Sequence, residues 1–119
     1  MFEGIPMETQ VALLKHALAR RDDLAGLIEP TIQAWLGRDL AALDAIRERI
    51  GARYPEVAEH YRVLFRRVVR NRSIVMAYRL FVPLRRGGVF VAVGANHLYG
   101  EEGLLRLIEK QGYRVERAY

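Results

Sequence analysis

The residues with the clearest chemical potential lie in one short stretch, residues 94–103, around a single histidine, His97. This stretch follows an apolar, β-branched segment, residues 89–93, that is typical of a buried parallel strand. Because ligands of open α/β sheets collect beyond the carboxyl ends of strands, His97 is predicted to face such a crevice, with Gly94 turning the backbone out of the strand. An imidazole there can bind a divalent metal or transfer protons near neutral pH. A hydrogen bond within the loop is the alternative interpretation of a lone histidine.

A second candidate is the pair Arg70-Asn71 on a long basic segment. A guanidinium group binds carboxylates bidentately and an amide adds one donor and one acceptor, so the pair could hold a substrate or orient metal ligands. A solvated helix face is the alternative. Glu101 and Glu102 could assist His97, but acidic residues at a helix start stabilise the helix through its dipole, which is the interpretation we favour for them.

Composition excludes several classes of protein. A chain of 119 residues, 51% hydrophobic and 28% charged, is typical of one globular core. It has no cysteine, so disulfides, thiolate zinc clusters and a cysteine nucleophile are excluded. Its apolar runs are too short for a membrane span, and no secretory signal is visible, so the chain as it stands is expected in the cytoplasm. Glycine-rich phosphate loops, HExxH and GxSxG motifs and paired catalytic carboxylates are missing as well.

The positive charge belongs to one segment. The net charge is +5, and residues 45–86 hold eleven arginines against three glutamates. Such a segment raises the possibility of a polyanionic partner. It lacks the interleaved aromatic residues with which single-strand binders stack on bases, so nucleic-acid binding is the hypothesis that we rank last.

The first 80 residues are predicted to form helices. An amphipathic helix follows Pro6, which suits a first helical turn. Its apolar residues at helical spacing are Met7, Val11, Leu14 and Leu18. A second helix over residues 22–36 is expected to be kinked or split by Pro30, and Gly37 is expected to end it in a left-handed conformation.

Two further helices are predicted before residue 82. Asp39 is placed to cap a helix that Gly51 closes. Pro55 opens the longest helical segment, which keeps an apolar face through to about residue 80. His16 and His60 have no second ligand at metal-binding spacing, so both are interpreted as surface residues.

The last third of the chain predicts a strand, a helix and a strand. Residues 89–93 and 113–117 are the two strands, and residues 101–111 are the helix between them, followed by Gly112. One intervening helix requires parallel strands with a right-handed crossover. The predicted fold class is therefore α/β: one helix-rich domain over residues 1–119, helical over 6–82, with a small parallel βαβ element over 88–118. Two strands alone are marginal, so the sheet should be completed by self-association or by the rest of a larger fold.

Several landmarks occur in a fixed order along the chain. They are Arg70-Asn71, Met76-Ala77, the apolar segment 89–93, Gly94-x-x-His97 followed by Leu98 and Gly100, Gly103-Leu104, and the sequence QGYRV over 111–115. In this order they resemble the C-terminal half of the TraB/GumN family, which includes the Tiki proteins. Residues 6–10 and 35–39 look like the looser helical middle of that family, so the resemblance covers practically the whole chain.

The resemblance implies a divalent-metal hydrolase, with manganese, cobalt or zinc as the metal, and peptidase activity in the Tiki members. On that pattern His97 is a metal ligand and a catalytic residue, and Arg70 is the catalytic arginine near the site. The residues expected to shape the site are Asn71, Gly94, Asn96 and Gly100. The family carries two GxxH motifs and an acidic residue, whereas this chain has one GxxH, so the chain is expected to be inactive by itself.

Three functions follow from these features. The first is the C-terminal part of a metal-dependent hydrolase, with a peptide-like substrate. The alternatives are a non-catalytic assembly module, which the GumN name links to exopolysaccharide production, and a basic nucleic-acid-binding protein. The expected partner is a second copy of the chain or an N-terminal half, with no nucleic acid bound and no membrane span. Members of the family are often periplasmic or secreted.

Overall fold

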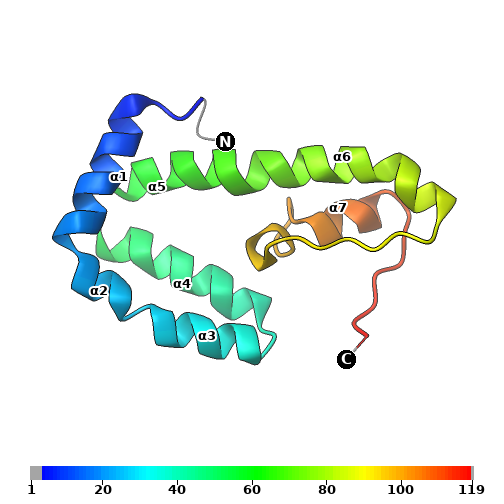
Figure 1. The fold of residues 1–119 in the computed structure, drawn as a ribbon, viewed down its shortest axis with the longest axis horizontal. Coiled ribbons are helices and arrows are strands. Elements are labelled where there is room, and N and C mark those ends of the chain that lie inside the picture. The colour runs from blue at the N-terminus through cyan, green and yellow to red at the C-terminus, as the bar shows by residue number, and fades with distance from the viewer. Residues whose placement is uncertain (1–3, 119) are drawn as a thin grey trace. The chain divides into compact units, whose positions relative to one another are not determined.

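The computed structural model of the protein describes residues 4–118 and divides the chain into two compact units, Met1–Val68 and Val69–Tyr119 (Figure 1). The helices of the first unit are α1 (Met7–Ala19), α2 (Arg21–Ala25), α3 (Ile28–Leu36), α4 (Leu40–Arg53) and α5 (Ala58–Phe65). A π-helical turn, Arg66–Arg70, spans the boundary. The second unit contains α6 (Asn71–Arg86), a 3₁₀ turn (Ala95–His97) and α7 (Leu104–Lys110). In the described part of the chain, no helix has the length and apolar character needed to cross a membrane.

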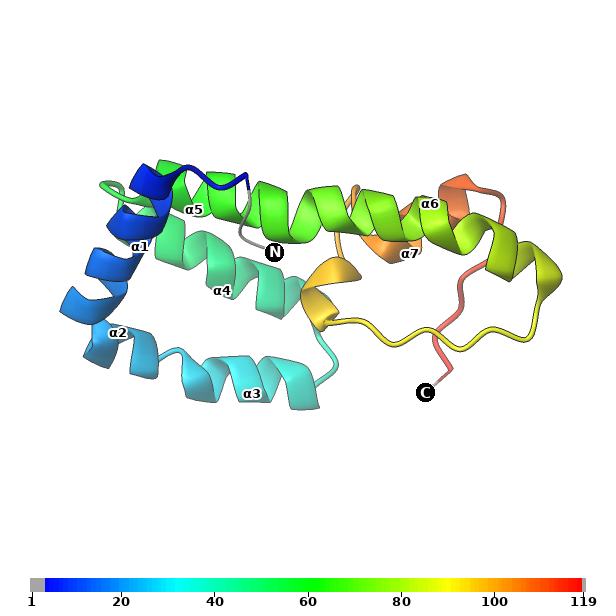
Figure 2. The ribbon, with the colours of Figure 1, turned by 45° about the horizontal axis from the view of Figure 1, so that its top comes forward.

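The first unit is built from helix pairs. Helix α3 packs against α4, α4 packs against α5, and α1 packs against α5 (Figure 2). The buried apolar residues of this unit are Ile5, Ala34, Ile46, Tyr54 and Val57. The guanidinium of Arg47 lies 4.1 Å from the centre of the Phe65 ring and adds a cation–π contact to the α4–α5 pair.

The ends of the helices test the predicted caps. The prediction for Asp39 is confirmed, because its Oδ1 accepts a hydrogen bond of 2.9 Å from the backbone N–H of Ala42. The predicted split of the second helix is confirmed too: Pro30 lies in the first turn of α3, where its missing N–H leaves no hydrogen bond unmade. The prediction for Gly37 is wrong, since its φ is −71° and Arg38 adopts the left-handed conformation at φ 56°. Helix α4 also continues past Gly51.

Helix α1 packs through its polar face and leaves its apolar stripe exposed. Thr9 and His16 are buried on the side that faces α5. The His16 ring makes an edge contact with Tyr54, at 4.6 Å between centroids, so the prediction of a surface histidine is wrong at this position. His60 on α5 is partly buried, and its Nδ1 lies 3.1 Å from the hydroxyl of Thr9.

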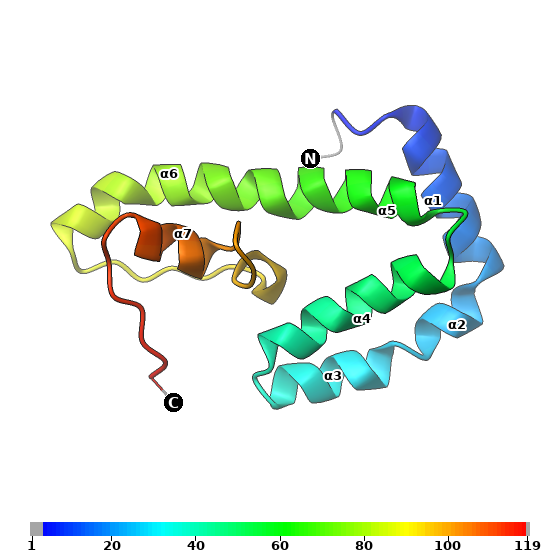
Figure 3. The same ribbon diagram turned by 180° about the vertical axis from the view of Figure 1, so that it is seen from behind.

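In the second unit α7 packs along α6 (Figure 3). The face of α6 carries the small buried residues Ser73 and Ala77, one helical turn apart, and α7 contributes Leu104, which is 2% exposed. Small residues allow the two helices to approach closely. The amide of Gln111, just after α7, donates a hydrogen bond of 3.2 Å to the carbonyl of Ala77 and fixes the far end of the pair.

The predicted βαβ element and the α/β fold class are wrong, because residues 4–118 contain helices and no strand. Both segments expected as strands are extended and unpaired: residues 113–118 run away from residues 88–94 in Figure 1 rather than alongside them. Phe90 is 92% exposed and Val89 41%, so the described chain covers the apolar side chains of this segment only in part. β-branched composition favours an extended backbone, but a strand also needs a neighbour with which to exchange hydrogen bonds.

The predicted helix over 101–111 is real but starts later, at Leu104, with Gly103 as its N-cap. Gly112 follows α7 with φ 93°, a left-handed conformation that favours glycine, as the sequence indicates. The chain segment between the 3₁₀ turn and α7 is therefore a loop. This loop holds the residues around His97 against α6.

Candidate functional site

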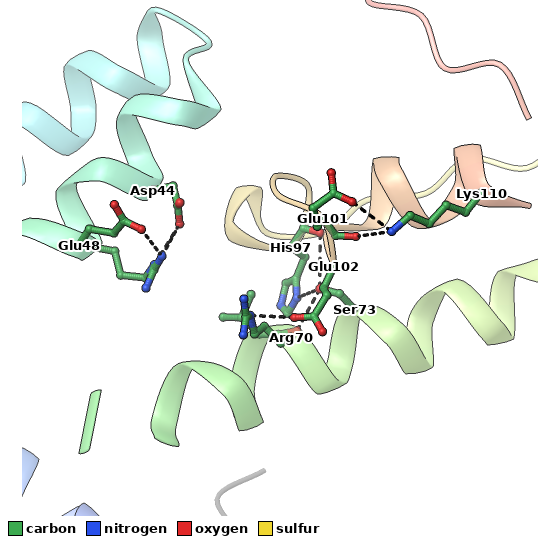
Figure 4. A network of polar contacts seen from close by, with 10 residues as sticks. Asp44, Glu48, Arg70, Ser73, His97, Glu101, Glu102 and Lys110 are labelled. Atoms are coloured by element: carbon green, nitrogen blue, oxygen red, sulfur yellow. Dashed lines mark hydrogen bonds and ion pairs between the residues drawn. The ribbon is translucent and has the colours of Figure 1, made fainter. Parts of the chain in front are cut away.

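His97 is anchored to α6 by one buried hydroxyl, that of Ser73. His97 is the last residue of the 3₁₀ turn and is half-buried, and its Nδ1 lies 3.1 Å from Oγ of Ser73 (Figure 4). The same hydroxyl lies 3.5 Å from the carbonyl oxygen of His97. Ser73 is 1% exposed, so this contact is shielded from competing water. The imidazole is held at the ring nitrogen nearest the backbone.

Hydrogen-bond counting assigns the ring tautomer. The hydroxyl of Ser73 has one proton, and its shortest contact is the 2.9 Å hydrogen bond that it donates to the carbonyl of Val69. Its oxygen then accepts from Nδ1–H of His97. In a neutral ring this leaves the lone pair on Nε2, which is the nitrogen available to a metal ion or a proton.

An ion pair lies on the same side of α6. Nε of Arg70 lies 2.9 Å from a carboxylate oxygen of Glu102, and Figure 4 shows this pair beside the Ser73–His97 contact. Arg70 precedes Ser73 by three residues, so both side chains share one helical face. The two side chains are 56% and 45% exposed, which screens the pair and lets solutes reach it.

The two acidic residues before α7 do not cap it. The helix starts at Leu104 with Gly103 as its N-cap, so the predicted placement of Glu101 and Glu102 in the first helical turn is wrong. Glu101 instead accepts a hydrogen bond of 3.2 Å from Lys110. This hydrogen bond, followed by the positive charges of Lys110 and Arg106, lowers the pKa of the Glu101 carboxyl.

Two glycines constrain the loop: Gly100, which was predicted to shape the site, and Gly103, which was not. Gly100 has φ 90° and needs glycine for that reason. At Gly103 a Cβ atom would overlap the carbonyl oxygen of Tyr99 and lie 2.5 Å from that of Leu98. Gly94 has φ −62° and ψ 140°, which any residue adopts, so the special backbone role predicted for Gly94 is wrong.

Two residues expected to shape the site stand apart from it. Asn71 opens α6 and Asn96 lies in the 3₁₀ turn, and both are exposed. Within residues 4–118, neither side chain hydrogen-bonds to His97. Sequence reasoning missed Ser73, and it considered Glu102 as an assistant of His97 rather than as the ion-pair partner of Arg70. The spacing of Ser73 from Arg70 on a helix is the signal that could have found Ser73.

The described residues do not make up a complete metal shell. In residues 4–118 no group of three or more His, Asp or Glu side chains converges as metal ligands would. His97 offers one nitrogen, and the carboxylate of Glu102 is already bound to Arg70. A catalytic zinc site in contrast uses about three protein ligands and one open position. These side chains could therefore supply only part of the ligand set of the metal that the family resemblance implies.

A separate groove lies within the first unit, among α2, α3 and α4, and holds about 490 Å³. The hydroxyl of Tyr54 on its wall donates a hydrogen bond of 2.8 Å to Asp23. Burial and then this hydrogen bond raise the pKa of the Tyr54 phenol. The wall is mainly apolar side chains, and none of the predicted site residues lines it.

The helical fold and the Ser73–His97 and Arg70–Glu102 pairs define a chain whose candidate site is a polar cluster between a helix and a loop. Comparison with models of protein families shows which family the chain belongs to. The model of the TraB/PrgY/gumN family matches residues 1–117, nearly the whole sequence. The chain belongs to the TraB/PrgY/gumN family. Searches of curated proteins and of solved structures found no match.

Proposed function

We propose that this chain contributes the His97 imidazole and the Arg70 guanidinium to a hydrolytic site of a TraB/PrgY/gumN-family protein, with a peptide-like substrate. The observation that carries the proposal is the convergence of Ser73, His97, Arg70 and Glu102 on one side of α6. The loop that carries His97 has a buried hydroxyl on an imidazole and, beside it, an exposed ion pair.

Each side chain has a defined task in this proposal. Ser73 keeps the His97 ring oriented, with Nε2 directed away from the hydrogen bond. Nε2 accepts a proton or serves as one ligand of a divalent ion. When bound, such an ion supplies electrophilic activation of a carbonyl group and of water. Arg70 is held through Nε by Glu102, and its terminal nitrogens can bind a substrate carboxylate or a developing oxyanion.

The remaining ligands must come from another polypeptide segment or from a second copy, because one imidazole does not complete a metal site. We therefore expect the isolated chain to bind divalent ions weakly and to hydrolyse peptides at a negligible rate. Robust peptide hydrolysis by the isolated chain that persists in His97→Ala would contradict the assignment of His97.

Paramagnetic broadening of NMR signals tests weak metal binding directly. Titration with Mn²⁺ should broaden the signals of Ser73 and His97 first. His97→Ala should abolish this local broadening. His60→Ala is the matched control, because His60 is also a partly buried histidine whose Nδ1 contacts a hydroxyl at 3.1 Å, and it should leave the broadening unchanged. Broadening centred elsewhere, or unaltered in His97→Ala, would refute the proposed metal ligand.

A non-catalytic assembly module is the second candidate function, and a specific observation favours it. Large apolar side chains are exposed at helical spacing on α3, where Ile28 is 60%, Ile32 43% and Trp35 65% exposed. Extended apolar patches on a soluble protein mark interaction surfaces. A chain that binds no Mn²⁺ at His97 but forms a defined oligomer would favour this candidate over the hydrolytic one.

A further inference from the structure

Helix α1 presents its apolar stripe to solvent. The four side chains and their exposed fractions are Met7 71%, Val11 41%, Leu14 61% and Leu18 69%. Their spacing of four, three and four residues places them on one helical face, as in the a and d positions of two heptads. The opposite face packs on α5 and buries Thr9 and His16, which are polar. The helix thus buries two polar side chains and exposes four of its five large apolar ones, all except Leu13.

The charges of α1 lie together on one flank of this stripe. Glu8 and Lys15 are seven residues apart, two helical turns, so they project from the same side. They are the only Asp, Glu, Lys or Arg residues of α1, and the two charges cancel. Within residues 4–118 neither side chain forms an ion pair. The stripe therefore has one anionic and one cationic end along the same edge.

We propose that the α1 stripe is a dimer interface that binds a second copy of this chain, with the two α1 helices antiparallel about a two-fold axis. In that arrangement Met7 faces Leu18 of the second copy, and Val11 faces its Leu14. The flanks then bring Glu8 opposite Lys15 of the second copy. A two-fold interface repeats each contact, so the same ion pair forms twice.

The charge pattern selects this occupant over others. A parallel pair would set identical residues at the same level and leave Glu8 and Lys15 about two turns apart, so no ion pair would form. An anionic lipid surface attracts basic amphipathic helices, but α1 has no net charge. The antiparallel second copy is the occupant that uses the apolar seam and both charges.

Light scattering and sedimentation velocity of the purified chain over a range of concentrations test the interface. The wild type should form a reversible dimer. Leu14→Lys should weaken dimerisation at least about tenfold, because it places two cations in the centre of the seam. The matched control is Ile32→Lys on α3, at an apolar side chain that is 43% exposed, and it should dimerise like the wild type. A monomeric wild type, or a dimer that Ile32→Lys breaks and Leu14→Lys does not, would overturn the proposal.

A charge swap tests the antiparallel orientation. Glu8→Lys and Lys15→Glu should each weaken the homodimer about fivefold, since each turns two attractions into repulsions. Both positions are solvent-exposed, so both variants should fold, which circular dichroism checks. An equimolar mixture of the two variants should dimerise as tightly as the wild type, because the cationic flank of one chain then meets the anionic flank of the other. Failure of the mixture to recover would rule out the antiparallel pairing. No step of this test depends on metal binding or on His97.

Discussion

The two units contain the same polar contact in two different settings. Thr9 and His60 in the first unit, and Ser73 and His97 in the second, each place a hydroxyl oxygen 3.1 Å from Nδ1 of an imidazole. The hydroxyl of Ser73 donates to the carbonyl of Val69, so its oxygen accepts from the ring. Within residues 4–118 the Thr9 hydroxyl has no other acceptor for its proton, so we expect it to donate to the ring. The same pair of groups is therefore expected to fix opposite tautomers.

The difference shows how a helix can select the free nitrogen of a histidine. A serine hydroxyl that bonds back to its own helix becomes an acceptor towards its other neighbour. His97 is then expected to present the lone pair of Nε2, and His60 to carry its proton there. An exposed ion pair of opposite charges, Arg70 with Glu102, accompanies His97, which makes the second contact the better candidate for chemistry.

The largest expected effect is a loss of stability when a substitution disturbs the backbone of the loop next to His97. Gly103→Ala should destabilise the protein by about 2–4 kcal/mol and displace the loop that carries His97, because the new Cβ meets two backbone carbonyl oxygens that cannot move independently. Chemical denaturation measures the loss.

Gly94→Ala is the matched control for Gly103→Ala. Its Cβ would lie 3.8 Å from the His97 ring, an ordinary van der Waals contact, so stability should change by less than about 0.5 kcal/mol. Equal losses in the two variants would show that the loop geometry around Gly103 is wrong.

Removing the hydroxyl group of Ser73 or of Thr9 tests the difference between His97 and His60. Ser73→Ala should cost about 1–3 kcal/mol, because it leaves the Nδ1–H group of His97 without its partner. It should also release the His97 tautomer without altering that of His60. Thr9→Ala should do the reverse. Nitrogen chemical shifts of the two rings measure both effects, and a Ser73→Ala spectrum in which His97 is unchanged would disprove the anchoring role of Ser73.

A smaller effect is expected for the ion pair. Glu102→Gln should cost about 0.2–1 kcal/mol, since both side chains are about half exposed and solvent screens their attraction. A double-mutant cycle with Arg70→Gln isolates the coupling. No change in the Ser73–His97 contact is expected, and a large shift of the His97 signals in Glu102→Gln would show that the two contacts depend on each other.

The smallest effect is a pH dependence at Glu101, near the end of the loop between the 3₁₀ turn and α7. The Lys110 hydrogen bond lowers the pKa of Glu101 in the folded chain. Its stabilisation is therefore present above the unfolded pKa and is lost as the pH falls through the lower folded value. Lys110→Met should return the pKa of Glu101 toward its ordinary value in an NMR titration, and an unchanged titration would exclude this hydrogen bond in solution.

Sequence patterns predicted some local features of this fold, although the conformation of Gly37 and the helix end at Gly51 were predicted wrongly. The cap at Asp39 and the helix start after Pro6 depend on side chains close in sequence, and both are present in the structure. The strands failed for a non-local reason. Residues 89–93 have strand composition, but a strand exists only with a partner, and the described chain provides none. The apolar period of α1 likewise predicted a helix but not which face would be covered.

The candidate site was predicted in part. His97 and Arg70 were selected from a motif resemblance and side-chain chemistry, and the structure places both at one side of α6. Ser73 was missed because a serine within a helix is chemically unremarkable until a partner 24 residues away reaches it. The partner of Arg70 was missed because acidic residues before a helix have a common alternative role.

The tautomer of His97 tests the central claim most directly. A long-range proton–nitrogen correlation spectrum of the imidazoles, recorded in alkaline solution with both rings neutral, distinguishes the two ring nitrogens. We predict a proton on Nδ1 and a lone pair on Nε2 for His97, and the opposite pattern for His60. A proton on Nε2 of His97 would contradict this assignment and remove the nitrogen that the proposed hydrolytic site requires.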